Sequence, residues 1–179
     1  MPPERSYGRK SVRLSSTPSD LMAPDAAGWT AQVLTLFPEV FPGVLGASLT
    51  GRALRDGLWY LDAIDLRDFG FGRHRDVDDT PAGGGAGMVL RADVIGPAIE
   101  VARARVVGPL PLFYLSPRGV PFTQAIAEQL AAGPGLSLIC GRFEGVDERV
   151  LQEYGVRELS LGDFVLSGGE IAAQAVIDA

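Results

Sequence analysis

The sequence has very few of the residues that build covalent or metal-bound frameworks. Cys140 is the only cysteine and His74 the only histidine among its 179 residues. A single cysteine excludes an intramolecular disulfide, and a zinc site made of cysteine and histidine lacks its ligands. A reducing compartment is the default for such a chain, so we expect a cytoplasmic protein.

Long apolar segments and lysine are also scarce. No apolar run approaches the roughly 20 residues that a membrane-spanning helix needs, so we expect no membrane partner. Lys10 is the only lysine, and the 16 basic residues are outnumbered by 22 acidic residues. This balance is opposite to the one that phosphate contacts favour. RNA binding nevertheless stays open, because net charge hides how charges are distributed and arginine suits phosphates and base edges.

Residues 1 to about 28 are predicted to form a disordered tail. Proline, serine and arginine are frequent there, and no hydrophobic period is present. The segment is basic enough for a transit peptide, but Glu4 and Asp20 argue against one. A misassigned start codon, with Met22 as the true start, is an equal alternative. We therefore expect the folded domain to cover residues 29–179.

The remainder of the chain alternates between strand and helix patterns. Short β-rich runs predict strands at residues 31–36, 58–64, 110–115, 136–140 and 156–161. Helical spacing predicts helices at residues 45–54, 91–105, 148–154 and 170–179, and one that begins near Thr123. Residues 67–88 have the composition of a loop. This alternation predicts an α/β domain with a mostly parallel sheet flanked by helices.

Three of the predicted strands lead into loops that combine glycine with charged residues, at residues 115–119, 140–149 and 160–170. In open α/β sheets ligands bind outside the carboxyl ends of the strands, so these loops would form one pocket. Glycine there lets the backbone approach a ligand closely. Ordinary strand-to-helix turns are the alternative for any one loop. A glycine run within residues 74–88 does not match the phosphate-binding pattern, and is either a surface loop or a substrate contact.

Four of these segments resemble the signature blocks of bacterial tRNA (guanine-N1)-methyltransferases, members of the SPOUT class of trefoil-knotted methyltransferases. The blocks are residues 83–88, 115–119, 140–150 and 160–170, and the resemblance runs from about Trp29 to the end. Ala82 stands where an aromatic residue is common in the family. The resemblance implies a deep trefoil knot near the carboxyl end, an exception to the rule that chains avoid threading. It also implies a homodimer and a methyl donor, S-adenosylmethionine, bound in the knot.

The resemblance assigns roles to residues of each block. Glu144 matches a functionally important carboxylate near the cofactor and the reacting base, and Asp78 matches another acid linked to activity. The cofactor-binding residues implied by the match are Leu115, Ser116 and Pro117 in the first loop, Gly141, Phe143 and Gly145 in the second, and Leu161, Gly162, Asp163, Phe164, Val165, Leu166, Gly168 and Gly169 in the third.

The implied substrate is the guanosine just 3′ of the tRNA anticodon, methylated at N1. A general base must remove the N1 proton, and an arginine or a metal ion such as Mg²⁺ should stabilise the charge that develops on O6. In the family, the base is an aspartate after the final helix and the assisting arginine lies just beyond that helix. Both positions fall after Ala179. We therefore expect a truncated chain, without the basic carboxyl-terminal domain, that is weakly active or inactive.

Two other functions stay open. The chain could be a non-catalytic knotted dimer that binds the cofactor without turnover, or another SPOUT RNA methyltransferase with a different target. The blocks at residues 83–88 and 140–150 argue against the different target. Cys140 is interpreted as a small buried residue at a strand end rather than a nucleophile.

Overall fold

The computed structural model describes residues 28–179, and the tail predicted for residues 1–28 lies, except for Gly28, outside the described residues. Five strands form one sheet in the order β2-β1-β6-β5-β7, and every neighbouring pair is parallel. The prediction of an α/β domain with a mostly parallel sheet is confirmed. The strands are β1 (Trp29–Thr35), β2 (Trp59–Asp65), β5 (Leu112–Pro121), β6 (Gly135–Cys140) and β7 (Arg157–Ser160).

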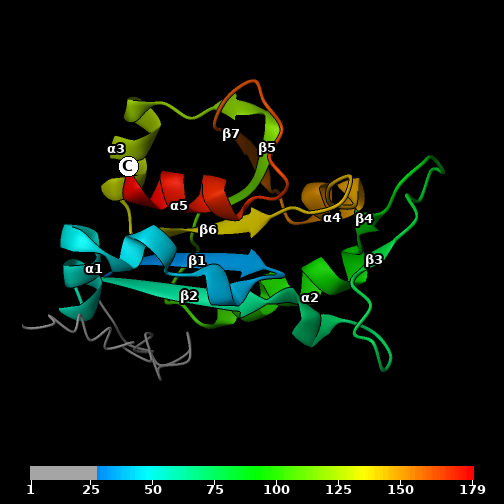
Figure 1. Ribbon diagram of the computed structural model, residues 1–179, viewed down its shortest axis with the longest axis horizontal. Coiled ribbons are helices and arrows are strands. Elements are labelled where there is room, and N and C mark those ends of the chain that lie inside the picture. The colour runs from blue at the N-terminus through cyan, green and yellow to red at the C-terminus, as the bar shows by residue number, and fades with distance from the viewer. Residues whose placement is uncertain (1–27) are drawn as a thin grey trace, which may run out of the picture.

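Helices cover both faces of the sheet (Figure 1). One face packs against α1 (Ser48–Arg55), α3 (Gln124–Ala131) and α5 (Glu170–Asp178), and the other against α2 (Ala92–Ala104) and α4 (Glu148–Glu153). None of the helices between residues 28 and 179 has the length and hydrophobicity that crossing a membrane requires.

Side-chain alternation along the central strands explains the two layers. In β1, Ala31 and Val33 are buried on the side of α5, and Leu34 is buried on the side of α2. In β6 every residue is buried, and Leu138 and Ile139 point to opposite faces in the same way. A strand that is covered on both faces reads as a continuous apolar run, which is why β6 was readily predicted.

The segment between β2 and α2 extends beyond the carboxyl ends of the strands (Figure 1). It contains the 3₁₀ helix η4 (Leu66–Phe69) and a two-stranded antiparallel ribbon of β3 (Asp78–Asp79) and β4 (Val89–Leu90). The loop predicted for residues 67–88 is therefore mostly confirmed, with these short elements added.

Two predicted boundaries are wrong. The helix predicted over residues 45–54 is divided: η3 (Gly43–Gly46) precedes an extended Ala47, and α1 begins at Ser48; the 3₁₀ helix η2 (Pro38–Val40) lies further upstream. The strand predicted to end at Leu115 continues to Pro121, because Val120 resumes pairing with β7. Both Leu115 and Val120 pair with Leu159, so the residues between them leave the ladder as a bulge.

A buried polar cluster ties α2 to the middle of the sheet. The Gln32 side chain donates to the Ala102 carbonyl over 2.8 Å and to the Asp62 carboxylate over 3.3 Å, and it accepts from the Ser137 hydroxyl over 2.8 Å. Arg105 forms a 2.8 Å ion pair with Asp62. Gln32, Asp62 and Ser137 are at most 5% exposed, so their hydrogen-bonding needs are met almost entirely within the protein.

Candidate cofactor-binding site

A cavity of about 370 Å³ lies beside the bulge of β5 and the ends of β6 and β7. This volume falls within the roughly 300–1,000 Å³ of small-molecule sites. Its wall is built from the β5 bulge, the loop after β6 and the long loop between β7 and α5. The lining residues are Tyr114, Leu115, Ser116, Pro117, Arg118, Gly141, Arg142, Phe143, Glu144, Gly145, Val146, Glu148, Leu159, Ser160, Leu161, Gly162, Phe164, Val165, Leu166, Ser167, Gly168, Gly169 and Ala172.

The structure brings together most of the residues that the sequence singled out. Every residue named above for cofactor binding lines this cavity except Asp163, which is exposed outside the lining. Glu144 also lines the cavity. Asp78 does not; it lies on β3, where it pairs with Leu90 of β4.

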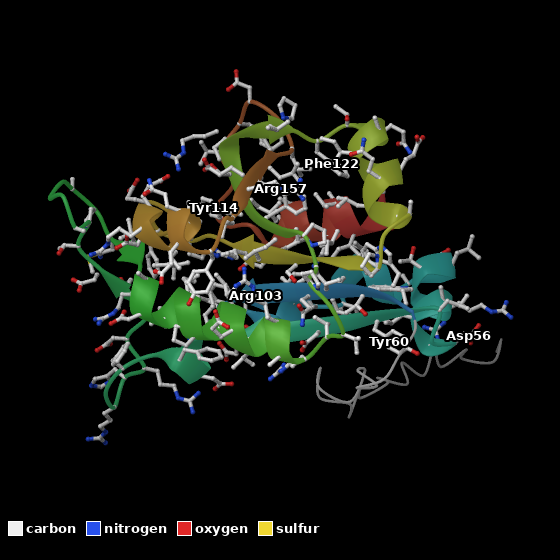
Figure 2. All side chains as sticks on the ribbon, turned by 180° about the vertical axis from the view of Figure 1, so that it is seen from behind. Asp56, Tyr60, Arg103, Tyr114, Phe122 and Arg157 are labelled. Carbon is white, nitrogen blue, oxygen red and sulfur yellow. The ribbon has the colours of Figure 1, made fainter. Side chains whose placement is uncertain are left out.

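Tyr114 explains why the loop after β6 contains glycine at two positions. A Cβ atom added to Gly141 would lie 2.6 Å from the Tyr114 ring, and one added to Gly145 would lie 3.0 Å from its hydroxyl. Figure 2 labels Tyr114, whose ring packs on the α2 side of the sheet. Burial raises the pKa of its phenol, so the hydroxyl stays neutral at physiological pH. The ring is therefore a fixed platform under this loop, a contact that the sequence analysis missed.

Phe143 holds an unusual backbone conformation in the same loop. Its φ is +57°, in the left-handed region that side chains other than glycine rarely adopt. The turn is closed by a 3.1 Å hydrogen bond from the Gly145 amide to the Arg142 carbonyl. The Phe143 side chain is 53% exposed at the cavity. Strained residues of this kind cluster at binding sites, where surrounding structure enforces them.

The glycine-rich segment before α2 packs against this loop. The Glu144 amide donates to the Met88 carbonyl over 2.9 Å, and the Leu90 amide donates to the Gly145 carbonyl over 2.8 Å. A Cβ atom on Gly87, whose φ is +87°, would collide with the Glu144 side chain. Two segments far apart in sequence thus place Glu144 beside the glycine run at the edge of the cavity.

The loop before α5 contacts the loop after β6 through backbone and side chain. The Gly169 amide donates to the Gly141 carbonyl over 3.1 Å. Arg142 donates to the Ser167 carbonyl over 3.0 Å and forms a 2.8 Å ion pair with Glu170. Local sequence patterns do not reveal the pair of Arg142 and Glu170, because the pairing depends on a contact between distant segments.

The cavity carries charges of both signs. Arg118 pairs with Glu148 at 3.4 Å and with Glu158 at 3.0 Å. Among the described residues, the carboxylates in the lining are Glu144 and Glu148, and residues 28–179 contain no group of three or more histidine, cysteine, aspartate or glutamate side chains placed to hold a metal ion. Such a wall suits an organic ligand with charged and apolar parts better than a bare metal ion.

The fold is an open, parallel α/β domain, and its cavity is lined by the β5 bulge and by the loops that follow β6 and β7. The family model described as tRNA (Guanine-1)-methyltransferase TrmD matches residues 30–179. The chain therefore belongs to this family.

Similar proteins share most of this chain. It is 66% identical over 157 residues to a tRNA (guanine-N(1)-)-methyltransferase of Ruegeria sp. (strain TM1040), covering 87% of this chain and 64% of that protein. The match to the protein of the same name from Roseobacter denitrificans is 66% over 151 residues, covering 84% and 63%. For Rhodopseudomonas palustris (strain TIE-1) it is 62% over 151 residues, covering 84% and 60%. The chain thus spans less than two thirds of the length of these relatives.

Proposed function

We propose that residues 29–179 form the S-adenosylmethionine-binding domain of a tRNA (guanine-N1)-methyltransferase, and that the cavity holds this methyl donor. The convergence of three glycine-containing loops on one cavity, in a chain of this family, is the observation that carries the proposal. Bound there, S-adenosylmethionine would supply an electrophilic methyl group for transfer to the nucleobase.

The residues present fit such a cofactor. Glycines at positions 141, 145 and 169 line the cavity and let the loop backbones approach closely, as in the hydrogen bond from the Gly169 amide to the Gly141 carbonyl. Leu115, Leu161 and Leu166 add apolar surface to the same wall. Apolar walls that carry a few polar groups to fix the orientation of the ligand are typical of cofactor sites.

Within this proposal the substrate is the guanosine 3′-adjacent to the anticodon, and N1 is the methylated atom. Glu144 would lie close to the reacting base, because it borders the cavity and the glycine run. Any Mg²⁺ that stabilises O6 would find at most Glu144 and Glu148 in the described lining, which suits an ion that keeps several waters.

Methylation at guanine N1 requires a group that accepts the N1 proton. In the proposal, none of the acids among the described residues has this role. The resemblance assigns that role to an aspartate after the final helix, and O6 stabilisation to an arginine beyond it. A polypeptide of these 179 residues should therefore bind the cofactor and methylate tRNA slowly or not at all. Loss of a general base alone lowers the rate about 10²–10⁴-fold.

A knotted chain path and a homodimer complete the proposal, with cytoplasmic tRNA as the partner. A knot at the cavity would bring the loops that line it together, and the loop before α5 does contact the loop after β6. Ile171, 66% exposed on α5, and Val165, 84% exposed beside the cavity, would gain cover from a twofold mate. Sedimentation is expected to show a dimer at micromolar concentration, and a monomer at that concentration and above would contradict this part.

The test of function combines binding and transfer. Calorimetry with S-adenosylmethionine and with its demethylated product measures binding to the 179-residue chain. A methyl-transfer assay compares this chain with one extended by the sequence that follows it in its genome, using unmodified tRNA and tRNA with adenosine at the target position. We expect both polypeptides to bind the cofactor and the extended one to methylate only the guanosine-containing tRNA.

The outcomes separate this function from its alternatives. Absence of cofactor binding would overturn the proposal. Binding without transfer by the extended polypeptide would instead indicate a non-catalytic cofactor-binding module, and methylation of the adenosine-containing tRNA would indicate a different target. Equal transfer rates for the two polypeptides would place the proton acceptor among the described acids, with Asp78, Glu144 and Asp163 the first to be replaced.

A further inference from the structure

Four residues at the carboxyl end of β1 form a closed ring of contacts, here named the β1 latch: Thr35, Phe37, Arg142 and Glu170. The Thr35 hydroxyl donates to one Glu170 carboxylate oxygen over 2.8 Å, and Arg142 donates to the other over 2.8 Å. The Arg142 guanidinium lies 4.5 Å from the centre of the Phe37 ring. The Phe37 amide donates back to the Thr35 hydroxyl over 3.0 Å.

The latch is anchored by groups that water barely reaches. Thr35 is fully buried and Glu170 is 4% exposed. A carboxylate in such a place needs hydrogen-bonding partners, because an unpaired buried charge is strongly destabilising. Glu170 has a partner for each oxygen, one from the sheet and one from the loop after β6. Its geometry therefore fixes where Arg142 lies.

The latch reaches the cavity through Arg142. This side chain lines the cavity and also donates to the Ser167 carbonyl in the loop before α5. Gly168 lies so close to the guanidinium that a Cβ atom would collide with it. Arg142 thus joins two of the three cavity loops, and its own position depends on a carboxylate and a hydroxyl outside the lining.

We propose that Glu170 and Thr35 are positioning residues for cofactor binding: they hold Arg142, and with it the two loops, in the arrangement that S-adenosylmethionine requires. This inference rests on the proposed function of the cavity. Neither residue lines the cavity, so each acts on the ligand through Arg142. A purely structural role would affect stability and leave the affinity of the folded protein unchanged.

The test uses variants that change the latch without changing its shape. Thr35→Val removes the hydroxyl and keeps a β-branched side chain, and Thr35→Ser keeps the hydroxyl. Glu170→Gln removes the charge and keeps the size. Calorimetry on the full chain with S-adenosylmethionine should show a Kd raised roughly five- to thirtyfold in Thr35→Val and Glu170→Gln, the range of coupling through contacting residues, and restored to within about twofold in Thr35→Ser.

Ser137→Ala is the matched control for stability. It removes a buried hydroxyl hydrogen bond from the sheet, that of Ser137 to Gln32, away from the cavity. We expect it to lower the melting temperature and to leave the Kd unchanged. A weaker Kd in Ser137→Ala equal to that in Thr35→Val would contradict the inference, because the effect would then follow general stability.

The remaining outcomes are also decisive. If Glu170→Gln does not fold, the Thr35 pair alone decides, since both of its members retain the charged pair of Arg142 and Glu170. Unchanged affinity in Thr35→Val, with normal binding by the unaltered chain, would overturn the latch alone. No binding by the unaltered chain would overturn the proposed function and the latch together.

Discussion

Two buried polar clusters share strand β1 and differ in what they serve. Gln32, near the middle of the strand, bonds to Ser137, Asp62 and the end of α2, all inside the protein. Thr35, three residues on, belongs to the β1 latch, whose Arg142 opens onto the cavity. In both clusters, buried polar side chains have hydrogen-bond partners within the protein. In the proposal, position along the parallel strand accounts for the two roles, because ligands in open α/β sheets bind beyond the carboxyl ends of the strands.

The largest effect is expected from Gly141→Val, which should disrupt the cavity beside the β1 latch and spare the interior cluster around Gln32. The new side chain would collide with the Tyr114 ring and force the loop after β6 away from its platform. We expect the Kd for S-adenosylmethionine to rise at least about 100-fold, or roughly 2.8 kcal/mol. Overpacking should also lower the free energy of unfolding by about 1–3 kcal/mol. Calorimetry and urea unfolding measure the two effects.

The control for Gly141 is Gly133→Ala. An added Cβ atom there meets its nearest neighbour, the Leu130 carbonyl, at 3.4 Å, which is ordinary contact, and the site is remote from the cavity lining. Both affinity and stability should stay close to those of the unaltered chain. Undiminished affinity in Gly141→Val would show that Gly141 is not part of the cofactor site. It would also contradict the proposal that the loop after β6 forms the central wall of that site.

The second prediction concerns the interior cluster around Gln32. Gln32→Leu leaves the buried Ser137 hydroxyl without a partner and Asp62 with only Arg105, whereas the Ala102 carbonyl keeps its hydrogen bond from the Arg105 amide. An unsatisfied buried group costs roughly 1–3 kcal/mol, so the free energy of unfolding should fall by about 1–3 kcal/mol. The cofactor Kd should change less than about twofold, since separated sites act independently. A large loss of affinity would show that the two clusters are coupled along β1.

The sequence predicted the elements far better than it predicted these clusters. Strand β6 and helix α3, which begins with a Thr123 side-chain cap, follow from local patterns in six to nine residues. The link between Thr35 and Glu170 joins residues at opposite ends of the chain and leaves no local signal. The β5 bulge was read as a loop at a strand end, because a bulge and a turn share the same composition of glycine and proline.

The site residues divide in the same way. Most of the residues to which the resemblance assigns cofactor binding line the cavity. A signature block also includes neighbours of the residues that contact a ligand. Asp163 is an exposed exception within its block. Tyr114 and Arg142 were missed because their roles depend on the ring beneath Gly141 and the carboxylate of Glu170, contacts that only the folded chain creates.

A smaller effect is expected from Asp147→Ala, which loosens the junction between the cavity loop and α4. Asp147 caps α4 by accepting from the Arg149 amide over 3.0 Å. Loss of such a cap costs about 0.5–2 kcal/mol of unfolding free energy. Urea unfolding at neutral pH should show this loss. The cofactor Kd should rise only slightly, because Asp147 itself does not line the cavity, although its neighbours Val146 and Glu148 do.

The same aspartate makes the effect depend on pH. The hydrogen bond from Arg149 lowers the pKa of Asp147 below its ordinary value. A lowered folded-state pKa gives stability that is present above the unfolded value of about 3.9 and is lost as pH falls through the folded value. The difference between the unaltered chain and Asp147→Ala should therefore be constant from pH 5 to 7 and shrink in acid. A difference that grows below about pH 4 would contradict the assigned pairing.

The smallest effect is expected at Cys140, which lies between the interior of the sheet and the cavity. It is fully buried at the end of β6, directly before Gly141. Burial raises the pKa of the thiol well above its ordinary value, so almost no thiolate forms near pH 8 and the sulfur is also shielded from reagents. In the native chain a chromogenic disulfide reagent should react with it only as fast as the protein opens, and unfolding in urea should make the reaction immediate. Adding S-adenosylmethionine should slow the native reaction further, because a ligand that binds only the folded state lowers the open population. Rapid reaction in the absence of urea would mean that the strand end is as mobile as an exposed loop, and the cavity wall could not then be the fixed surface from which the proposed function is argued.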